Sequence, residues 1–102
     1  MKLKDDSVDI TSIQPGLLVA LMVADGVYSE RGYECVLTSG RDGTHSTTSL
    51  HYAGAAVDLR VNNVPAELRP GIRDSIKHRL NQDFDVLLED DHIHIELQPR
   101  RH

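Results

Sequence analysis

The spacing of apolar residues predicts how the first half of the chain folds. Residues 15–30 (PGLLVALMVADGVYSE) repeat leucine, valine and methionine at helical intervals, which predicts a helix with proline in its first turn. Either Gly26 or the later Gly32 is expected to end this helix. Residues 33–39 (YECVLTS) form an apolar run with β-branched residues and predict a strand. The Gly-, Ser-, Thr- and Asp-rich residues 39–49 predict a loop.

The pattern changes from helical spacing to alternation in the middle of the chain. Residues 55–61 (AAVDLRV) predict a strand with Asp58 and Arg60 on the face opposite its apolar residues. A second helix is expected from about residue 65 to residue 80. The pair Pro70–Gly71 interrupts its first turns, which leaves a later start open.

The last part of the chain predicts a strand pair, residues 84–89 (FDVLLE) and 92–98 (HIHIELQ), joined by a tight turn at Asp90 and Asp91. The order of elements predicts an α+β fold, with helices packed on one face of a small, largely antiparallel sheet. We expect a single domain, residues 1–102.

Composition excludes several classes of protein. The net charge of −5 and the scattered basic residues argue against nucleic-acid binding through phosphate neutralisation. No apolar run approaches the roughly 20 residues needed to cross a bilayer, and no apolar signal segment follows the first lysines. We therefore expect a monomer made in the cytoplasm without membrane insertion, with later release to a cell wall or a virion left open. The only cysteine, Cys35, lies in an apolar run, which favours a buried thiol over a nucleophile.

Histidine and acidic residues gather on one face of the predicted sheet. In HIHIELQ, alternation places the isoleucines towards the core and His92, His94 and Glu96 on the other face. If this strand lies close to the one carrying Asp58, then His51, Asp58 and His94 could converge. Two imidazoles and one carboxylate are a common ligand set for a catalytic zinc ion. The small residues of GAA (54–56) would let the loop carrying His51 fold back against the strand, as would suit such a site.

These residues also resemble those of a known family. The pattern S-x-H-x-x-G-x-A-x-D, followed downstream by D-x-x-H in an HIH strand, is similar to the zinc DD-peptidase family. That family includes D-alanyl-D-alanine carboxypeptidases, vancomycin-resistance D,D-dipeptidases and phage L-alanyl-D-glutamate endolysins, and the hedgehog signalling domain shares its fold. The resemblance covers roughly residues 33–98, including the upstream TSGRDGTHS. Its first pattern consists of Ser49, His51, Gly54, Ala56 and Asp58.

The resemblance implies a zinc metallopeptidase with one Zn²⁺ ion, of the DD-carboxypeptidase or L-alanyl-D-glutamate endopeptidase type, that hydrolyses an amide bond in peptidoglycan stem peptides. It implies that His51, Asp58 and His94 are the zinc ligands. Asp91, three residues before His94, would act as general base and then as general acid. Arg41 would stabilise the substrate carbonyl or the developing oxyanion.

Some roles stay open. In a regular strand Asp91 would face away from His94, so it reaches the metal only from the preceding turn or a bulge. Glu89 and Asp90 are neighbouring alternatives for the base. His92 could replace His94 as a ligand, contact the substrate, or be a solvated side chain.

The remaining assignments concern the surroundings of the metal. We assign Ser49, Arg41 and His92 to substrate binding. Glu96 either orients a ligand imidazole or is an exposed strand residue, and His45 is expected at the rim of the site. The alternative function is a non-catalytic, metal-stabilised binding module or virion structural module of the same fold.

Overall fold

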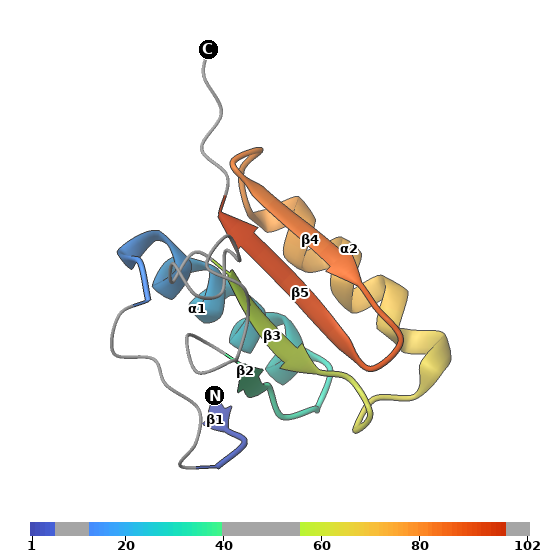
Figure 1. The fold of residues 1–102 in the computed structure, drawn as a ribbon. Helices are drawn as coiled ribbons and strands as arrows, with labels where there is room; N and C mark the ends of the chain where they lie inside the picture. The colour runs from blue at the N-terminus through green and yellow to red at the C-terminus, as the bar shows by residue number, and fades with distance from the viewer. Residues whose placement is uncertain (6–12, 40–55, 98–102) are drawn as a thin grey trace.

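The computed structural model describes residues 1–5, 13–39 and 56–97, and in it two helices cover one face of a five-stranded sheet (Figure 1). In chain order the elements are β1 (Lys2–Leu3), α1 (Pro15–Glu30), β2 (Val36–Ser39), β3 (Ala56–Arg60), the 3₁₀ turn η1 (Ala66–Leu68), α2 (Arg69–Arg79), β4 (Phe84–Leu88) and β5 (His92–Leu97). The strands lie in the order β1-β2-β3-β5-β4. The β1–β2 pair is parallel and the other three pairs are antiparallel. The predicted α+β class with a largely antiparallel sheet is therefore confirmed.

The first helix has the bounds that its apolar spacing predicts, and the later of the two glycines ends it. Gly32 adopts a φ of +81°, in the left-handed region that glycine enters without steric cost. The Tyr33 N–H donates to the carbonyl of Tyr28, and the Gly32 N–H donates to the carbonyl of Ser29, both at 3.0 Å. This pair of bonds is a Schellman motif, which satisfies carbonyl groups at the helix end and stops the helix.

The core lies between the helices and one face of the sheet. In the β3–β5 pair, Val57 lies opposite Ile95 and Leu59 lies opposite Ile93, and all four side chains are fully buried. They belong to one apolar cluster that includes Leu17 of α1 and Ile72 and Ile76 of α2. Because side chains alternate along a strand, the polar residues of β3 and β5 must lie on the face without helices.

The second helix begins later than residue 65, which the sequence left open. Helix α2 begins at Arg69, after the short η1 turn. Strand β1 was not predicted. It is only two residues long, and Lys2 and Leu3 pair with Val36 and Leu37, so its sequence has no room for an alternating pattern.

Cys35 is buried immediately before β2, as predicted. Burial raises the pKa of its thiol to about 12, so the thiolate is scarce at neutral pH and the residue packs rather than reacts. No helix in the described part of the chain has the length and apolar character that a bilayer crossing requires.

Candidate metal centre

Strand register brings the acidic residue of β3 beside the histidines of β5. Asp58 lies directly opposite His94, and Arg60 lies opposite His92. Directly paired residues in antiparallel strands have Cα atoms about 4.5–5.5 Å apart, close enough for their side chains to meet. The predicted convergence of Asp58 and His94 on the non-core face is therefore present.

The three side chains form a compact group. Oδ1 of Asp58 lies 2.8 Å from Nδ1 of His94 and 3.5 Å from Nε2 of His92. One donor atom from each of Asp58, His92 and His94 lies within 4.8 Å of the other two, so these residues are close enough to bind one metal ion. Asp58 and His94 are largely shielded from solvent, with side chains 18% and 16% exposed.

The donor set fits a small, tetrahedrally coordinated metal. Zinc bonds to histidine nitrogen and carboxylate oxygen at about 2.0–2.2 Å, so two ligand atoms in a tetrahedral site lie about 3.3 Å apart. The distances of 2.8 and 3.5 Å from Asp58 to the two imidazoles bracket that value. Changes of a few tenths of an ångström would therefore bring the Asp58 oxygen to that spacing from each imidazole.

Glu96 contacts the second nitrogen of His94. Its Oε1 lies 2.7 Å from Nε2 of His94, while Asp58 engages Nδ1. The hydrogen bond to Asp58, reinforced by the one to Glu96 and opposed by burial, raises the pKa of His94 above the ordinary 6.5. Of the two readings of Glu96 from the sequence, this contact fits the one in which it orients an imidazole. A carboxylate on the far nitrogen of a ligand histidine fixes the ring and increases its basicity.

Asp91 lies in the turn before β5, as its expected role requires. The turn is closed by a bond of 2.8 Å from the Glu89 N–H to the carbonyl of His92. Outside the regular strand, Asp91 escapes the alternation that would turn it away, and its Oδ1 lies 2.6 Å from Nδ1 of His92. Asp91 lines the same pocket as Asp58 and His92, whereas Glu89 and Asp90 do not. Among the three candidate bases, Asp91 is therefore the one beside the metal-capable group.

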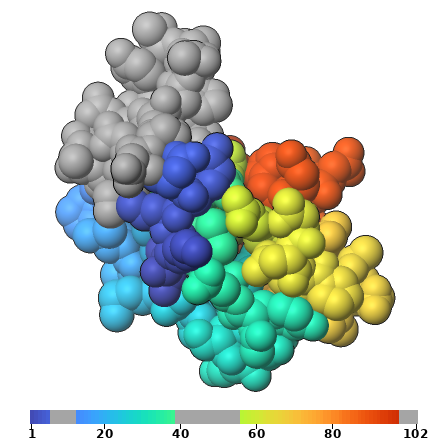
Figure 2. Space-filling model, turned by 90° about the horizontal axis from the view of Figure 1, so that it is seen from below, coloured from blue at the N-terminus to red at the C-terminus, as the bar shows by residue number. Residues whose placement is uncertain are grey.

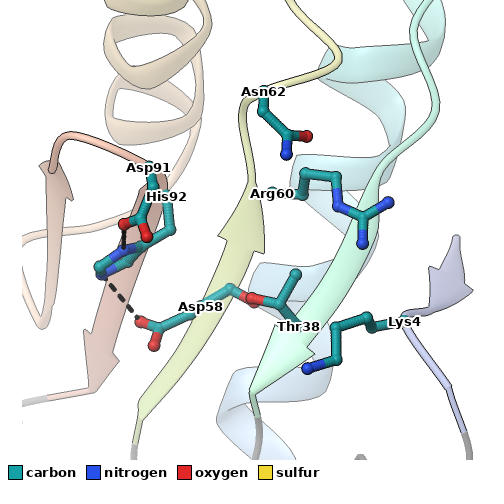
Figure 3. A pocket seen from close by; sticks show the side chains of 7 residues that line it. All are labelled: Lys4, Thr38, Asp58, Arg60, Asn62, Asp91 and His92. Atoms are coloured by element: carbon teal, nitrogen blue, oxygen red, sulfur yellow. Dashed lines mark hydrogen bonds and ion pairs between the residues drawn. The ribbon is translucent and has the colours of Figure 1, made fainter.

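The group borders a pocket of about 440 Å³ that runs across β5, β3 and β2 (Figure 3). At β2 the strand register shifts between Leu37 and Ser39, as at a β-bulge, a feature that often redirects a side chain beside a functional site. Thr38, between them, donates a hydrogen bond of 3.3 Å to the backbone carbonyl of Asp58. The lining residues are Lys4, Thr38, Asp58, Arg60, Asn62, Asp91 and His92.

Several predicted site residues lie outside the described residues: His51, Arg41, Ser49 and His45. The described part of the chain supplies His92 beside Asp58 and His94, so the second nitrogen donor of the group seen here is His92. Sequence reasoning missed Lys4 and Arg60 as pocket residues. The signal for Arg60 was present, because alternation placed it on the same face as Asp58.

Comparisons with known proteins identify no relative. No protein-family model matches the chain, and no match was found among the curated proteins or the solved structures. The site residues and the sequence pattern are therefore the features that point to a function.

Proposed function

We propose that this protein is a zinc-dependent peptidase that hydrolyses an amide bond in peptidoglycan stem peptides. The observation that carries the proposal is the group of Asp58, His92 and His94 at a pocket that Asp91 also lines. The choice of zinc is supported by a donor set of imidazole and carboxylate at near-tetrahedral spacing. The choice of peptidoglycan peptides is supported by the S-x-H-x-x-G-x-A-x-D and D-x-x-H patterns.

Asp58 and His94 would hold the ion through Oδ1 and Nδ1, with Glu96 keeping the His94 ring in place. Zinc supplies Lewis acidity, which polarises a carbonyl and lowers the pKa of a coordinated water to about 7. The nitrogen that completes the set comes from His92 or from His51.

The role of Asp91 depends on that third ligand. If Nε2 of His92 binds the ion, the contact of 2.6 Å between Asp91 and Nδ1 of His92 orients a ligand ring. If His51 binds the ion, the Asp91–His92 pair faces the pocket and can take a proton from water and return it to the leaving amine. We favour the second arrangement for catalysis, because the Asp91 side chain is 86% exposed and open to the pocket.

The test is hydrolysis of purified cell walls, followed by the appearance of new amino termini. With zinc supplied, the wild-type protein should release them, and a chelator should stop the release. Asp91→Asn should lower the rate by a factor on the order of 10²–10⁴, the usual contribution of a general base. Asp90→Asn is the matched control, since it removes the same charge from the neighbouring turn position and should leave the rate within about twofold.

Measuring bound zinc beside hydrolysis distinguishes a wrong proposal from a metal-binding protein that is not an enzyme. Activity that survives both chelation and Asp91→Asn would contradict the proposal. Stoichiometric zinc that raises the melting temperature, without hydrolysis of any wall substrate, would instead support the non-catalytic, metal-stabilised module. Replacing His92 and His51 singly by alanine would then identify the third ligand, because only loss of a ligand should weaken zinc binding strongly.

A further inference from the structure

The pocket beside the metal centre has two walls of opposite chemistry. Asp58, Asp91 and His92 form one wall, and Asp58 points towards His92, away from the other wall (Figure 3). Lys4 and Arg60 form the opposite wall, with both side chains lying over β2 (Figure 3).

Hydrogen bonds to the main chain hold both Lys4 and Arg60 in place. Lys4 follows β1, and its N–H donates to the carbonyl of Leu37 at 2.8 Å, which ties it to the neighbouring β2. The dark blue N-terminal residues lie against the green residues of β2 in the space-filling view (Figure 2). Arg60 lies on β3, two positions after Asp58 on the same face, and its backbone carbonyl accepts a bond of 2.8 Å from the Tyr28 hydroxyl. The short β1 strand therefore has a role, because it delivers Lys4 to the pocket.

No acidic side chain in the described part of the chain neutralises the positive charge of this wall. Neither Lys4 nor Arg60 forms an ion pair with an acidic side chain of residues 1–5, 13–39 or 56–97. The acidic residues of the site engage the histidines instead: Asp58 contacts His94, and Asp91 contacts His92. Two cations that line one pocket, in a protein of net charge −5, therefore form a local site for an anionic group.

We infer that Lys4 and Arg60 bind a free carboxylate of the substrate, so that the protein cleaves an amide close to a carboxylate. Two residues along a strand span about 7 Å, which sets the distance along β3 between the Asp58 and Arg60 backbones. One extended peptide residue spans about 3.3–3.6 Å. A carboxylate held by this wall therefore lies within about two residues of a carbonyl at the metal centre. A pocket of about 440 Å³ is in the range of small-ligand sites. The cleavage step of this inference rests on the proposed function, whereas the binding step does not.

Binding can be tested without metal or turnover. We would titrate the metal-free protein with N-acetyl-D-alanine and with its carboxamide, and follow backbone amide signals by NMR. The carboxylate should shift the signals of Lys4 and Arg60, and the carboxamide should not. The effect should weaken with added salt and disappear in Lys4→Met/Arg60→Gln. Lys77→Met, which removes one positive charge from α2 on the other side of the sheet, is the control and should bind like the wild type.

Two binding results would overturn the inference: equal shifts from the two compounds, or shifts that persist in the double variant. Tighter binding of inorganic phosphate than of the carboxylate, by tenfold or more, would also overturn it, because the wall would then select a phosphorylated ligand.

Turnover provides the second test. With zinc, an acylated D-alanyl-D-alanine peptide should be cleaved at least about tenfold more efficiently than its C-terminal carboxamide, the discrimination of one lost ionic contact. In Lys4→Met/Arg60→Gln the two peptides should be cleaved equally. If the wild type binds the carboxylate but hydrolyses neither peptide, the proposed function is wrong and the anion site is still supported. Hydrolysis that ignores the carboxylate would reject the anion site alone.

Discussion

The two faces of strand β5 are built from alternate residues of one short segment, yet they are held by different forces. Ile93 and Ile95 are fully buried against the helices. His92 and His94 lie on the face of the sheet without helices, called the open face below, and their side chains are 29% and 16% exposed. The isoleucines require only apolar neighbours at packing distance, because the hydrophobic effect is not directional. The histidines require specific partners at specific atoms.

This difference predicts that stability and metal binding can be separated by substitutions one residue apart. Substitutions on the core face should change the free energy of unfolding with little effect on the metal affinity of the folded protein. Substitutions on the open face should do the reverse.

The largest expected effect is on the core face. Ile95→Ala removes a fully buried side chain and should lower the free energy of unfolding by about 2–5 kcal/mol. Zinc affinity of the folded fraction should stay within about threefold. Denaturant unfolding with and without zinc measures both quantities. Leu87→Ala is the control, since Leu87 is 44% exposed and its loss should cost about 0.5 kcal/mol. A comparable cost at both positions would show that the two faces are not distinct.

On the open face, Glu96→Gln should weaken zinc binding by about 10–100-fold, because the carboxylate that orients His94 and increases its basicity is lost. Titration with a competing chelator measures the change. Glu89→Gln removes a carboxylate from the turn, outside the metal-capable group, and should leave the affinity unchanged. If the two variants bind zinc equally, the Glu96–His94 contact has no role in the metal site.

The pH dependence of the metal-free protein is a smaller test of the same contacts. The folded-state pKa of His94 is raised, chiefly by its hydrogen bond to Asp58. Its bonds therefore stabilise the fold fully below the unfolded value of about 6.5, and the stabilisation is lost as the pH rises through the folded value. The melting temperature should therefore fall as the pH rises above about 6.5. The fall should be smaller in His94→Gln, and an identical fall in both proteins would contradict the assignment.

The smallest expected effect concerns the shifted register at β2. Thr38→Val removes the hydroxyl that donates to the Asp58 carbonyl and should cost about 0.5–1.5 kcal/mol of stability. Zinc affinity should change by less than about threefold if the bond only supports the strand. A larger loss would mean that Thr38 helps to position the Asp58 carboxylate. Measuring unfolding and zinc affinity on the same variant distinguishes these results.

The sequence predicts the faces of the strands better than it predicts which strands are neighbours. Alternation in β3 and β5 correctly places Asp58 and His94 on the open face, because burial against the helices leaves only one register for the isoleucines. The direct pairing of Asp58 with His94 could not be derived in this way, since it depends on strand order and on contacts far apart in the chain.

The contributions of Lys4 and Asp91 have other physical origins. Lys4 reaches the pocket only because a two-residue strand pairs with β2, and so short a strand has no recognisable periodicity. Asp91 faces the site because it lies in a turn, where alternation gives no direction. His92 shares a face with His94 in the sequence pattern, but only the side-chain geometry brings its Nε2 to 3.5 Å from Asp58.

Asp58 and His94 are proposed to be ligands of one metal ion. The most direct test is a zinc titration of the wild-type protein and of Asp58→Asn, which keeps the shape of the side chain and removes its charge. We predict one zinc ion per wild-type chain and an affinity at least about 100-fold lower in the variant, since a ligand is lost rather than a residue that orients one. The absence of zinc binding in the wild type, or equal affinity in the two proteins, would contradict the account.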